Sequence, residues 1–299
     1  TRIARDAPVL ILELYEERTV PGGATNVAVN ARSLGAEVFL AGVVGDDVPG
    51  QRLRQAIGEL GMCQEGLVSD ARRPTSTKTR IVAGSSQIVQ QQVVRIDRID
   101  NSDLVDGSKS YIIDYIKRVL PSMDAVVLSD YANGVISPQI LEVCLPVAQQ
   151  LGKVIVADSH GSLLRFHGVT AITPNQPEAE LTLGVSINTQ AELQDAGQRL
   201  LDGSHAGSIL ITRGAEGISL FERDKAPVHL PVHHLDHASE IVDTNGAGDT
   251  VAATFTLALT AGASFVEAAC LANAAAALVV RRQGCASNTP QELMRAFHA

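Results

Sequence analysis

The stretch that decides the fold and function of this chain is Ile241-Val242-Asp243-Thr244-Asn245-Gly246-Ala247-Gly248-Asp249-Thr250. A run of apolar and small residues follows it from Val251 to Leu259 and predicts a helix. Glycines at 246 and 248 allow the backbone to turn tightly and to approach a ligand closely. The free N–H groups at the start of a helix, together with the helix dipole, attract negative charge. The stretch therefore predicts an anion site at a helix N-terminus.

Asp249 falls inside this predicted anion site, where a carboxylate beside a bound phosphate is electrostatically unfavourable. General base catalysis explains its presence, because Asp249 could take the proton from an attacking hydroxyl while the amides hold a transferring phosphoryl group. The alternative is an Asp that only caps a helix after a glycine turn. The complete Asp-Thr-x-Gly-Ala-Gly-Asp string is far more specific than a Gly-x-Gly turn, and it favours catalysis.

The rest of the chain alternates short apolar runs with helical patterns. Strands are predicted at 38–45, 125–130, 154–158 and 208–212, and helices at 49–60, 137–151, about 189–201 and 290–297. Strands rich in Val, Ile and Leu that are separated by helices indicate a parallel sheet covered on both faces, with ligands beyond the carboxyl ends of the strands. Two segments, 9–18 and 76–97, are extended or rich in Thr, Gln and Val, and they predict a small β-layer or lid beside the main sheet.

Composition excludes several classes of protein. The chain has 299 residues, 45% of them hydrophobic and 19% charged, which is typical of a folded domain rather than a disordered chain. Its formal net charge of −9 argues against a general nucleic-acid or anionic-membrane surface. No stretch is apolar for the roughly 18 residues that span a bilayer. Four cysteines without a CxxC pair are typical of reduced thiols, so we expect a cytoplasmic protein.

The glycine string resembles the signature of the ribokinase-like carbohydrate kinases, the pfkB family. Further segments resemble motifs of that family in the same order along almost the whole chain: Gly22-Gly23-Ala24-Thr25-Asn26-Val27-Ala28, Leu34-Gly35-Ala36, Gly42-Val43-Val44-Gly45-Asp46-Asp47, Thr173-Pro174-Asn175-Gln176-Pro177-Glu178 and Thr212-Arg213-Gly214-Ala215-Glu216-Gly217. Within the family, residues 2–9, 94–97, 129–134 and 272–276 resemble the heptose-7-phosphate kinases of lipopolysaccharide precursor synthesis.

The resemblance implies an α/β fold: a ribokinase-like three-layer αβα sandwich with a mostly parallel central sheet and a small β lid. We expect one kinase domain over residues 1–299, with lid segments at about 9–20 and 76–97. The family normally opens with a strand ending in Gly-Asp-x-x-x-Asp, whose last Asp binds the sugar. This sequence starts after that point, so we expect upstream residues to supply the strand. The heptose enzymes often carry a second, nucleotidyl-transferring domain, and we expect a kinase-only protein here because the sequence stops soon after its last predicted helix.

The resemblance also implies an activity, namely transfer of the γ-phosphate of ATP to a sugar hydroxyl with Mg²⁺, most closely on heptose 7-phosphate. Asp249 would be the base, and the amides of Gly246, Ala247 and Gly248 would form the anion hole. The implied nucleotide contacts are Thr212, Arg213, Gly214, Gly217, Thr244 and Asn273. The implied sugar contacts are Gly22, Gly23, Asn26, Lys78, Arg80, Arg95 and Asp130. Asn175 and Glu178 would hold Mg²⁺ through water.

Each of these assignments has an alternative. Asn175 and Glu178 form a possible helix-capping pair, and Asn26 could cap the helix it opens. Arg213 could be a surface arginine and Asn273 a satisfied core amide, whereas the three lid cations could be solvated. His229, His233, His234 and His237 cluster around Pro231, and a polar strand and turn is favoured there over a metal site.

Two departures from the heptose subgroup bear on the substrate. Asn133 and His160 stand where the subgroup usually has lysines. If either lysine holds phosphate in the subgroup, its replacement here changes the charge available for that contact. The alternatives are therefore a kinase for another small sugar, such as ribose or fructose, or a sensor that binds sugar or nucleotide without turnover. The family commonly pairs through its lid, so we expect a homodimer, with 9–18 as a candidate edge.

Overall fold

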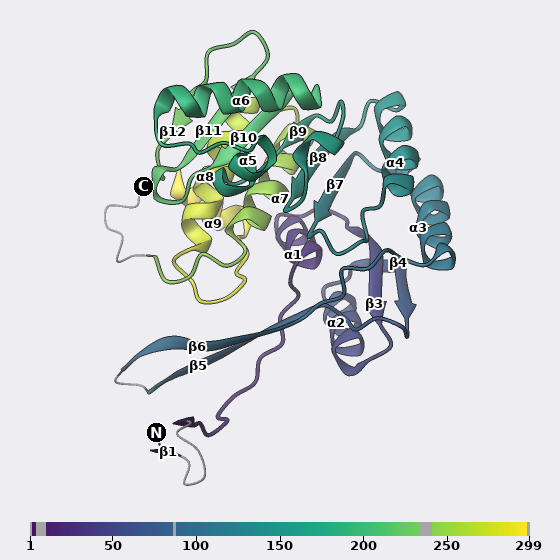
Figure 1. Cartoon of the computed structure of the whole chain (residues 1–299), viewed down its shortest axis with the longest axis vertical. Helices are drawn as coiled ribbons and strands as arrows, with labels where there is room; N and C mark the ends of the chain where they lie inside the picture. Colours follow the sequence, from purple (N-terminus) through teal and green to yellow (C-terminus); the bar gives the residue numbers. More distant parts are fainter. Residues whose placement is uncertain (1, 4–9, 86–87, 234–240, 298–299) are drawn as a thin grey trace.

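The computed structural model describes residues 2–3, 10–85, 88–233 and 241–297, and its centre is a six-stranded sheet (Figure 1). The order of strands in this sheet is β12-β11-β10-β9-β8-β7. β7 to β10 run parallel, and β11 and β12 are antiparallel additions at one edge. The strands of this sheet are β7 (Ala125–Asp130), β8 (Val154–Ser159), β9 (Ala171–Ile172), β10 (Ser208–Thr212), β11 (Ile218–Glu222) and β12 (Val228–Leu230).

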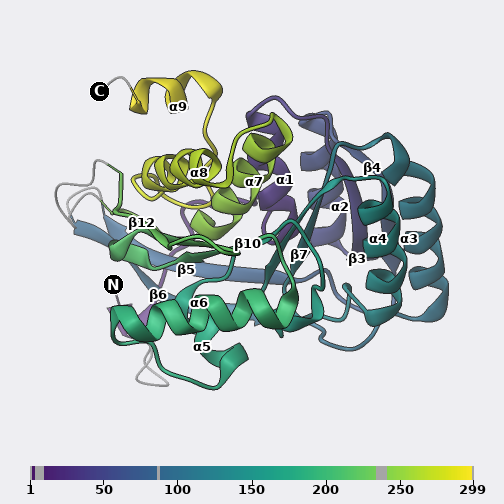
Figure 2. The ribbon, with the colours of Figure 1, turned by 90° about the horizontal axis from the view of Figure 1, so that it is seen from above.

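Helices cover both faces of this sheet (Figure 2). α4, α5 and α6 lie on one face, and α7 and α8 lie on the other with α1 and α9 beside them. The helices are α1 (Ala24–Ser33), α2 (Val48–Glu59), α3 (Asp106–Val119), α4 (Pro138–Gln150), α5 (Gln176–Leu183), α6 (Gln190–Ser204), α7 (Ala247–Thr260), α8 (Phe265–Val279) and α9 (Pro290–Ala296). The structure therefore confirms the three-layer αβα arrangement that the sequence predicts.

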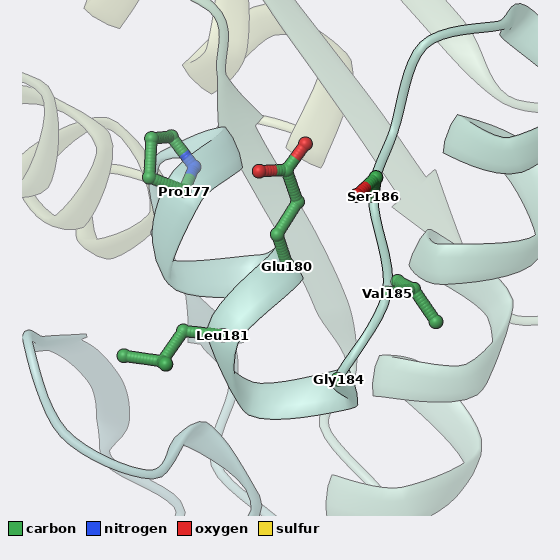
Figure 3. Close-up of a pocket in the computed structure, with 6 residues that line it drawn as sticks. All are labelled: Pro177, Glu180, Leu181, Gly184, Val185 and Ser186. Carbon is green, nitrogen blue, oxygen red and sulfur yellow. The ribbon is translucent and has the colours of Figure 1, made fainter.

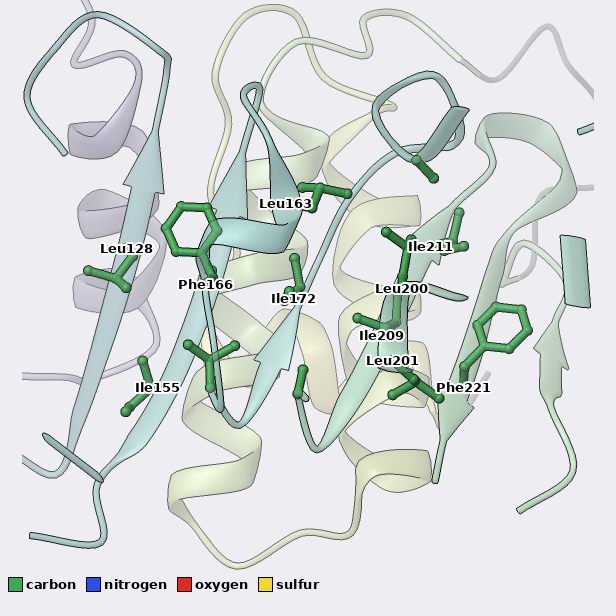
Figure 4. Close-up of a cluster of buried hydrophobic side chains, with 14 of the residues drawn as sticks. Leu128, Ile155, Leu163, Phe166, Ile172, Leu200, Leu201, Ile209, Ile211 and Phe221 are labelled. Carbon is green, nitrogen blue, oxygen red and sulfur yellow. The ribbon is translucent and has the colours of Figure 1, made fainter. Parts of the chain in front are cut away.

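Strand side chains alternate between the two helical layers. In β8, Ile155 packs in the cluster that contains α4 and α6, whereas Val156 packs against α7 and α8. In β10, Ile209 and Leu210 divide in the same way, and Figure 4 shows the first of these two clusters. Because successive side chains of a strand point to opposite faces, strands with a helix layer on each side need continuous apolar sequence.

A second, smaller sheet lies beside β7. β3 (Phe39–Gly45) and β4 (Cys63–Asp70) pair in parallel, and α3 packs against both of them and against α4. In the part of the chain that the structure describes, β7 has a strand partner on one side only, and so has β3. The two sheets are therefore joined by helix packing rather than by hydrogen bonds between strands.

The lid is a hairpin of β5 (Thr77–Ser85) and β6 (Ile88–Arg98) that projects from the body (Figure 1). β1 (Arg2–Ile3) pairs with β2 (Leu10–Ile11), and the chain then runs to α1 without further strand structure. The prediction of a β-layer over 9–20 is thus wrong for residues 12–20, which lie exposed without a strand partner among the described residues. Their charged residues, such as Glu16 and Arg18, pair with each other in solvent instead of entering a sheet.

The predicted elements of the main body are confirmed with small shifts of their ends. Asp47 and Ser137 accept hydrogen bonds from backbone N–H groups at the starts of α2 and α4, and prolines occupy the first turns of both helices. The capping boxes of α6, α8 and α9 fix the starts of these helices in the same manner. No helix within the described ranges is long and apolar enough to cross a bilayer.

Candidate active site

The N-terminus of α7 begins at a glycine in the left-handed conformation. Gly246 is the N-cap residue and has φ +80°, and a Cβ there would lie 2.4 Å from Nδ2 of Asn26. Gly248 is different, since a Cβ at this exposed position would meet no atom within 4 Å. The backbone conformation and the neighbouring Asn26 therefore require glycine at position 246. No protein atom requires glycine at position 248, where the missing side chain leaves open space beside the start of the helix.

The amides of this turn are partly free. The N–H of Ala247 donates to the carbonyl of Thr244 over 3.3 Å, so this predicted member of the anion hole already has a partner. The N–H groups of Gly248 and Asp249 lie in the first turn, where no intrahelical acceptor exists, and no other described residue accepts from them. The side chain of Asp243 anchors the turn by accepting from the backbone N–H groups of Asn245 and Gly284. The result is a fixed loop with free donors at the start of α7.

Asp249 is buried, with 6% of its surface exposed, and two side chains hold its carboxylate. Nδ2 of Asn26 donates to Oδ2 over 2.7 Å, and the hydroxyl of Tyr131 donates to Oδ1 over 2.9 Å. Burial raises the pKa of Asp249, while these two hydrogen bonds and the charges of His160 and Lys78 oppose the increase. A desolvated carboxylate with a raised pKa suits the acceptance of a proton.

A buried polar network connects Asn26 to the rest of the α1–α7 junction. Nδ2 of Asn30 donates to the backbone carbonyl of Asn26 over 2.9 Å, and the hydroxyl of Thr250 donates to Oδ1 of Asn30 over 3.0 Å. All three side chains are about 1% exposed. Asn26, which the sequence assigns to the sugar, thus uses one amide hydrogen to bind Asp249, on the helix packed against its own.

Tyr131 follows β7 and stands between several predicted site residues. Its ring lies 3.5 Å from the position that a Cβ of Gly23 would take, and Gly23 has φ +55°. The ring of His160 meets it edge-on at 4.6 Å between centroids, and Nζ of Lys78 lies 5.5 Å from its centroid. Burial and the negative charge of Asp249 raise the pKa of Tyr131, so its hydroxyl stays protonated and donates.

Acidic side chains gather at the carboxyl end of β8. Burial, followed by the charges of Asp249 and Glu178, raises the pKa of Asp158 to about 7. His160 contacts Oε1 of Glu178 through Nδ1, and this hydrogen bond raises the pKa of His160. His160 therefore contacts one carboxylate of this acidic group through its imidazole.

Asn175 and Glu178 form a capping box at the start of α5. Oδ1 of Asn175 accepts from the N–H of Glu178 over 2.9 Å, and Oε2 of Glu178 accepts from the N–H of Asn175 over 2.8 Å. The structural alternative raised by the sequence is therefore present, and Glu178 also contacts His160. Among the described residues, no group of three or more His, Cys, Asp or Glu is arranged as a metal site.

The predicted nucleotide segment 212–217 joins β10 and β11. Gly217 has φ +82°, and a Cβ there would lie 2.1 Å from the carbonyl oxygen of Leu230. Gly214 also has a positive φ but faces open space. Nε of Arg213 donates to Oε1 of Gln176, and its guanidinium pairs with Glu216, whereas Thr212 bridges to Asn175. This loop and the start of α5 therefore adjoin.

Asn273 lines a cavity of about 310 Å³ between α8, the segment after β12 and Phe297. Its Nδ2 donates to the carbonyl of Pro231 over 2.6 Å, so it is a satisfied amide at a cavity wall. His233 lines the same cavity, and His229 contacts the hydroxyl of Ser219. His234 and His237 lie outside the described residues.

A larger open pocket of about 470 Å³ lies beside α5 (Figure 3). Pro177, Glu180, Leu181, Gly184, Val185 and Ser186 line this pocket. None of them is a predicted site residue, and their polar side chains are those of Glu180 and Ser186 (Figure 3). Size alone therefore does not identify the site in this fold.

The lid brings two of its three predicted cations to the site. Lys78 approaches Tyr131, and Nη2 of Arg80 donates to Oδ1 of Asn245 over 2.8 Å. Arg95 pairs opposite Arg80 in the hairpin, but its guanidinium forms an ion pair with Asp97 at 3.0 Å. Lys78 and Arg80 are thus directed toward the α7 turn, and Arg95 is engaged within the lid.

The remaining predicted residues occupy the edge of the site. Thr244 is exposed just before Gly246, and a Cβ at Gly22 would meet nothing within 4 Å. Asp130 is 3% exposed, and its carboxylate accepts from the hydroxyl of Ser159 and the N–H of Ala132. Asp130 therefore holds the loop that carries Tyr131.

Sequence reasoning did not assign a role to Tyr131, Asp158 or Asn30. Tyr131 directly follows β7 and Asp158 lies near the end of β8, and these two strands are parallel neighbours. The carboxyl ends of parallel strands meet at one edge of the sheet, so this placement could have identified both residues from the sequence. Asn30 lies four residues after Asn26 on one helix face, which is a weaker signal.

The sequence from residue 4 to residue 292 matches the family described as pfkB family carbohydrate kinase. Bifunctional protein HldE of Citrifermentans bemidjiense is 38% identical over 294 residues, which are 98% of this chain and 58% of the relative. The bifunctional protein HldE of Caulobacter sp. strain K31 is 40% identical over 299 residues, covering 99% of this chain and 59% of the relative. The chain therefore spans about three fifths of the length of these curated relatives.

Solved structures share the fold at lower identity. Phosphofructokinase-2 from Escherichia coli in complex with fructose-6-phosphate has a TM-score of 0.72 at 16% identity, covering 96% of this chain and 92% of that one. Arabidopsis thaliana ribokinase complexed with ribose and ATP has a TM-score of 0.72 at 20% identity, covering 96% and 93%.

Proposed function

Because the chain belongs to the pfkB family of carbohydrate kinases, we propose that it transfers the terminal phosphate of ATP to a sugar hydroxyl, with Asp249 as the base. The observation that carries the proposal is the arrangement at the start of α7. A buried carboxylate with a raised pKa lies in the same helical turn as two free backbone amides. Phosphoryl transfer depends mainly on such positioning and charge stabilisation.

The proposed roles follow from the contacts. Asp249 accepts the proton of the attacking hydroxyl, and Asn26 and Tyr131 fix its carboxylate. The N–H groups of Gly248 and Asp249 stabilise charge on the transferring phosphoryl group. On the nucleotide side we propose the loop 212–217 and the cavity wall at Asn273, because the loop joins β10 to the antiparallel strand β11 and the cavity adjoins β12, the edge strand.

Mg²⁺ fits the charge at the end of β8. Burial and the charges of Asp249 and Glu178 raise the pKa of Asp158, and a divalent cation would relieve this crowding of carboxylates. We propose that Glu178 and Asn175 hold the ion through water, as suits a strongly hydrated cation. When bound, it would neutralise charge on the ATP phosphates.

For the substrate we propose heptose 7-phosphate. The support is the resemblance of segments such as 94–97 and 129–134 to heptose-7-phosphate kinases, together with the identity to proteins named HldE. Lys78 and Arg80, which point from the lid to the α7 turn, suit a sugar that already carries a phosphate. His160 would supply part of the positive charge that the subgroup's lysine provides.

We further propose that the protein is a homodimer that pairs through its lid. We propose that it works in the cytoplasm, where ATP is available. One face of the hairpin exposes apolar side chains, with Val94 45% and Ile96 54% exposed. Alternation along β6 places both on the face opposite Arg95 and Asp97. Exposed apolar strands of this kind are commonly covered by a partner, and a second copy offers the same surface.

A further strand is proposed between β7 and β3. Each has an edge without a partner in the described ranges, both run parallel to their neighbours, and helices α1 and α3 connect the two sheets. The family's opening strand, with its sugar-binding Asp, suits this position. A chain extended upstream should unfold at a higher temperature than residues 1–299, and an unchanged Tm would contradict the proposal.

The kinase proposal is tested by a coupled ADP-release assay over a panel of sugars and sugar phosphates. We expect heptose 7-phosphate to be the best acceptor, and Asp249→Asn to lower kcat by about 10²–10⁴-fold. Calorimetry checks that the variant stays folded. Nucleotide binding without turnover on any acceptor would indicate a sensor, and turnover that survives Asp249→Asn would exclude Asp249 as the base.

A further inference from the structure

Tyr131 makes a contact that neither the glycine string nor the fold requires. It lies in the loop after β7, 118 residues away from Asp249 in sequence, and donates its hydroxyl to Oδ1 of that carboxylate. The carboxylate of Asp130 fixes the loop, and His160 borders the ring edge-on. The hydroxyl of a half-buried tyrosine usually has an acceptor, and here the acceptor is the group assigned as the base.

We propose that Tyr131 is a positioning residue for phosphoryl transfer, because its hydroxyl orients the carboxylate of Asp249 toward the substrate hydroxyl. The inference rests on the proposed kinase function. In the transfer, the sugar hydroxyl gives its proton to Asp249 and its oxygen bonds to the γ-phosphorus. The bond from that phosphorus to the bridging oxygen of ADP breaks, and ADP leaves. The O–H bond of Tyr131 stays intact throughout.

The orientation depends on both carboxylate oxygens. Asn26 holds Oδ2 from α1, and Tyr131 holds Oδ1 from the loop after β7. If only one donor remained, the carboxylate could rotate about its terminal torsion, which has a broad energy profile. The two donors together therefore keep a fixed lone pair available to the substrate, and a loss of orientation lowers the rate strongly.

The same contact affects the proton affinity of the base. The groups that face Asp249 are Asn26 on α1, Lys78 on β5, Asp158 and His160 at the end of β8, and Cys285 after α8. Lys78 and His160 favour the ionised form, whereas burial opposes it, and the ionised form also gains the hydrogen bond from Tyr131. Without this hydroxyl the carboxylate loses a donor, so its pKa rises and a larger fraction is protonated at a given pH.

The test is Tyr131→Phe, which removes the hydroxyl and keeps the ring. Tyr111→Phe is the matched control, since the Tyr111 hydroxyl donates to the carbonyl of Glu65 at 3.0 Å, away from the site. Asp249 must be ionised to act, so activity falls as the pH drops through its pKa. We expect Tyr131→Phe to move the acid limb of kcat/KM to higher pH and to lower kcat at pH 7 by about 10–100-fold. The sugar KM should change less, and Tyr111→Phe should match the wild type.

A second readout does not need turnover. The ¹³C carboxyl resonance of Asp249, identified by its loss in Asp249→Asn, should titrate at higher pH in Tyr131→Phe than in the wild type. An unmoved titration and an unmoved acid limb would overturn the inference, as would a lower kcat with an unmoved limb, which indicates packing alone. If the wild type phosphorylated no sugar, the kinase proposal would fail, and the titration would still decide whether Tyr131 binds the carboxylate.

Discussion

The α1–α7 junction and the lid hairpin approach the same site with opposite physical character. At the junction, Asn26, Asn30 and Thr250 are about 1% exposed and hydrogen-bonded to one another or to Asp249. In the lid, Lys78 and Arg80 reach the site through one contact each, from a hairpin that projects into solvent. A buried network holds one geometry because a broken bond there leaves an unpaired polar group, whereas exposed contacts form and break at small cost. The junction thus suits the chemistry, and the lid suits recognition of the substrate.

The largest expected effects come from the two glycines of the junction. Gly246→Ala places a Cβ against Asn26 at positive φ, so we expect a loss of about 1–2 kcal/mol in the free energy of unfolding, together with lower activity. Gly248→Ala meets no protein atom, and we expect unchanged or higher stability but a kcat about 100-fold lower, because the methyl group crowds the free amides. Denaturant unfolding and kinetics on both variants check this difference. Full activity in Gly248→Ala would mean that the helix start does not hold phosphate.

A smaller effect is expected in the lid. Lys78→Ala should raise the KM for a phosphorylated sugar about tenfold, because one charge-assisted contact is lost, while the KM for the unphosphorylated sugar stays nearly constant. Arg95→Ala is the control, since Arg95 already pairs with Asp97. Steady-state kinetics with both sugars measures the difference. Equal changes for the two sugars would show that Lys78 does not recognise the phosphate.

The smallest effect on activity is expected at the outer face of the lid. Ile96→Glu puts a charge on the exposed apolar face, and we expect it to convert a dimer into a monomer with little change in kcat. Leu181→Glu is the control, because Leu181 is also an exposed apolar residue, at 76%, and it belongs to α5 rather than to the lid. Sedimentation of both variants and the wild type decides the matter. A wild-type monomer, or a dimer that tolerates Ile96→Glu, would contradict pairing through this face.

Periodicity and the glycine string were sufficient to predict the αβα layers and the place of Asp249. They were insufficient for contacts between distant segments. Asn26 carries two amide hydrogens that suit a sugar as well as a carboxylate, and only the packing of α1 on α7 shows that one of them binds Asp249. Asn175 and Glu178 likewise match both a capping pair and a cation site, and the structure shows the capping pair. The residues 12–20 are extended in pattern, but no strand lies beside them among the described residues.

The bond between Asn26 and Asp249 joins residues 223 positions apart. During synthesis on the ribosome, α1 and the lid hairpin emerge first, and Asp249 appears only after α6 and the antiparallel edge of the sheet have been made. A nascent chain cut anywhere between these two residues holds no assembled centre. With Asp249 as the proposed base, catalytic competence is therefore one of the last properties that this polypeptide acquires.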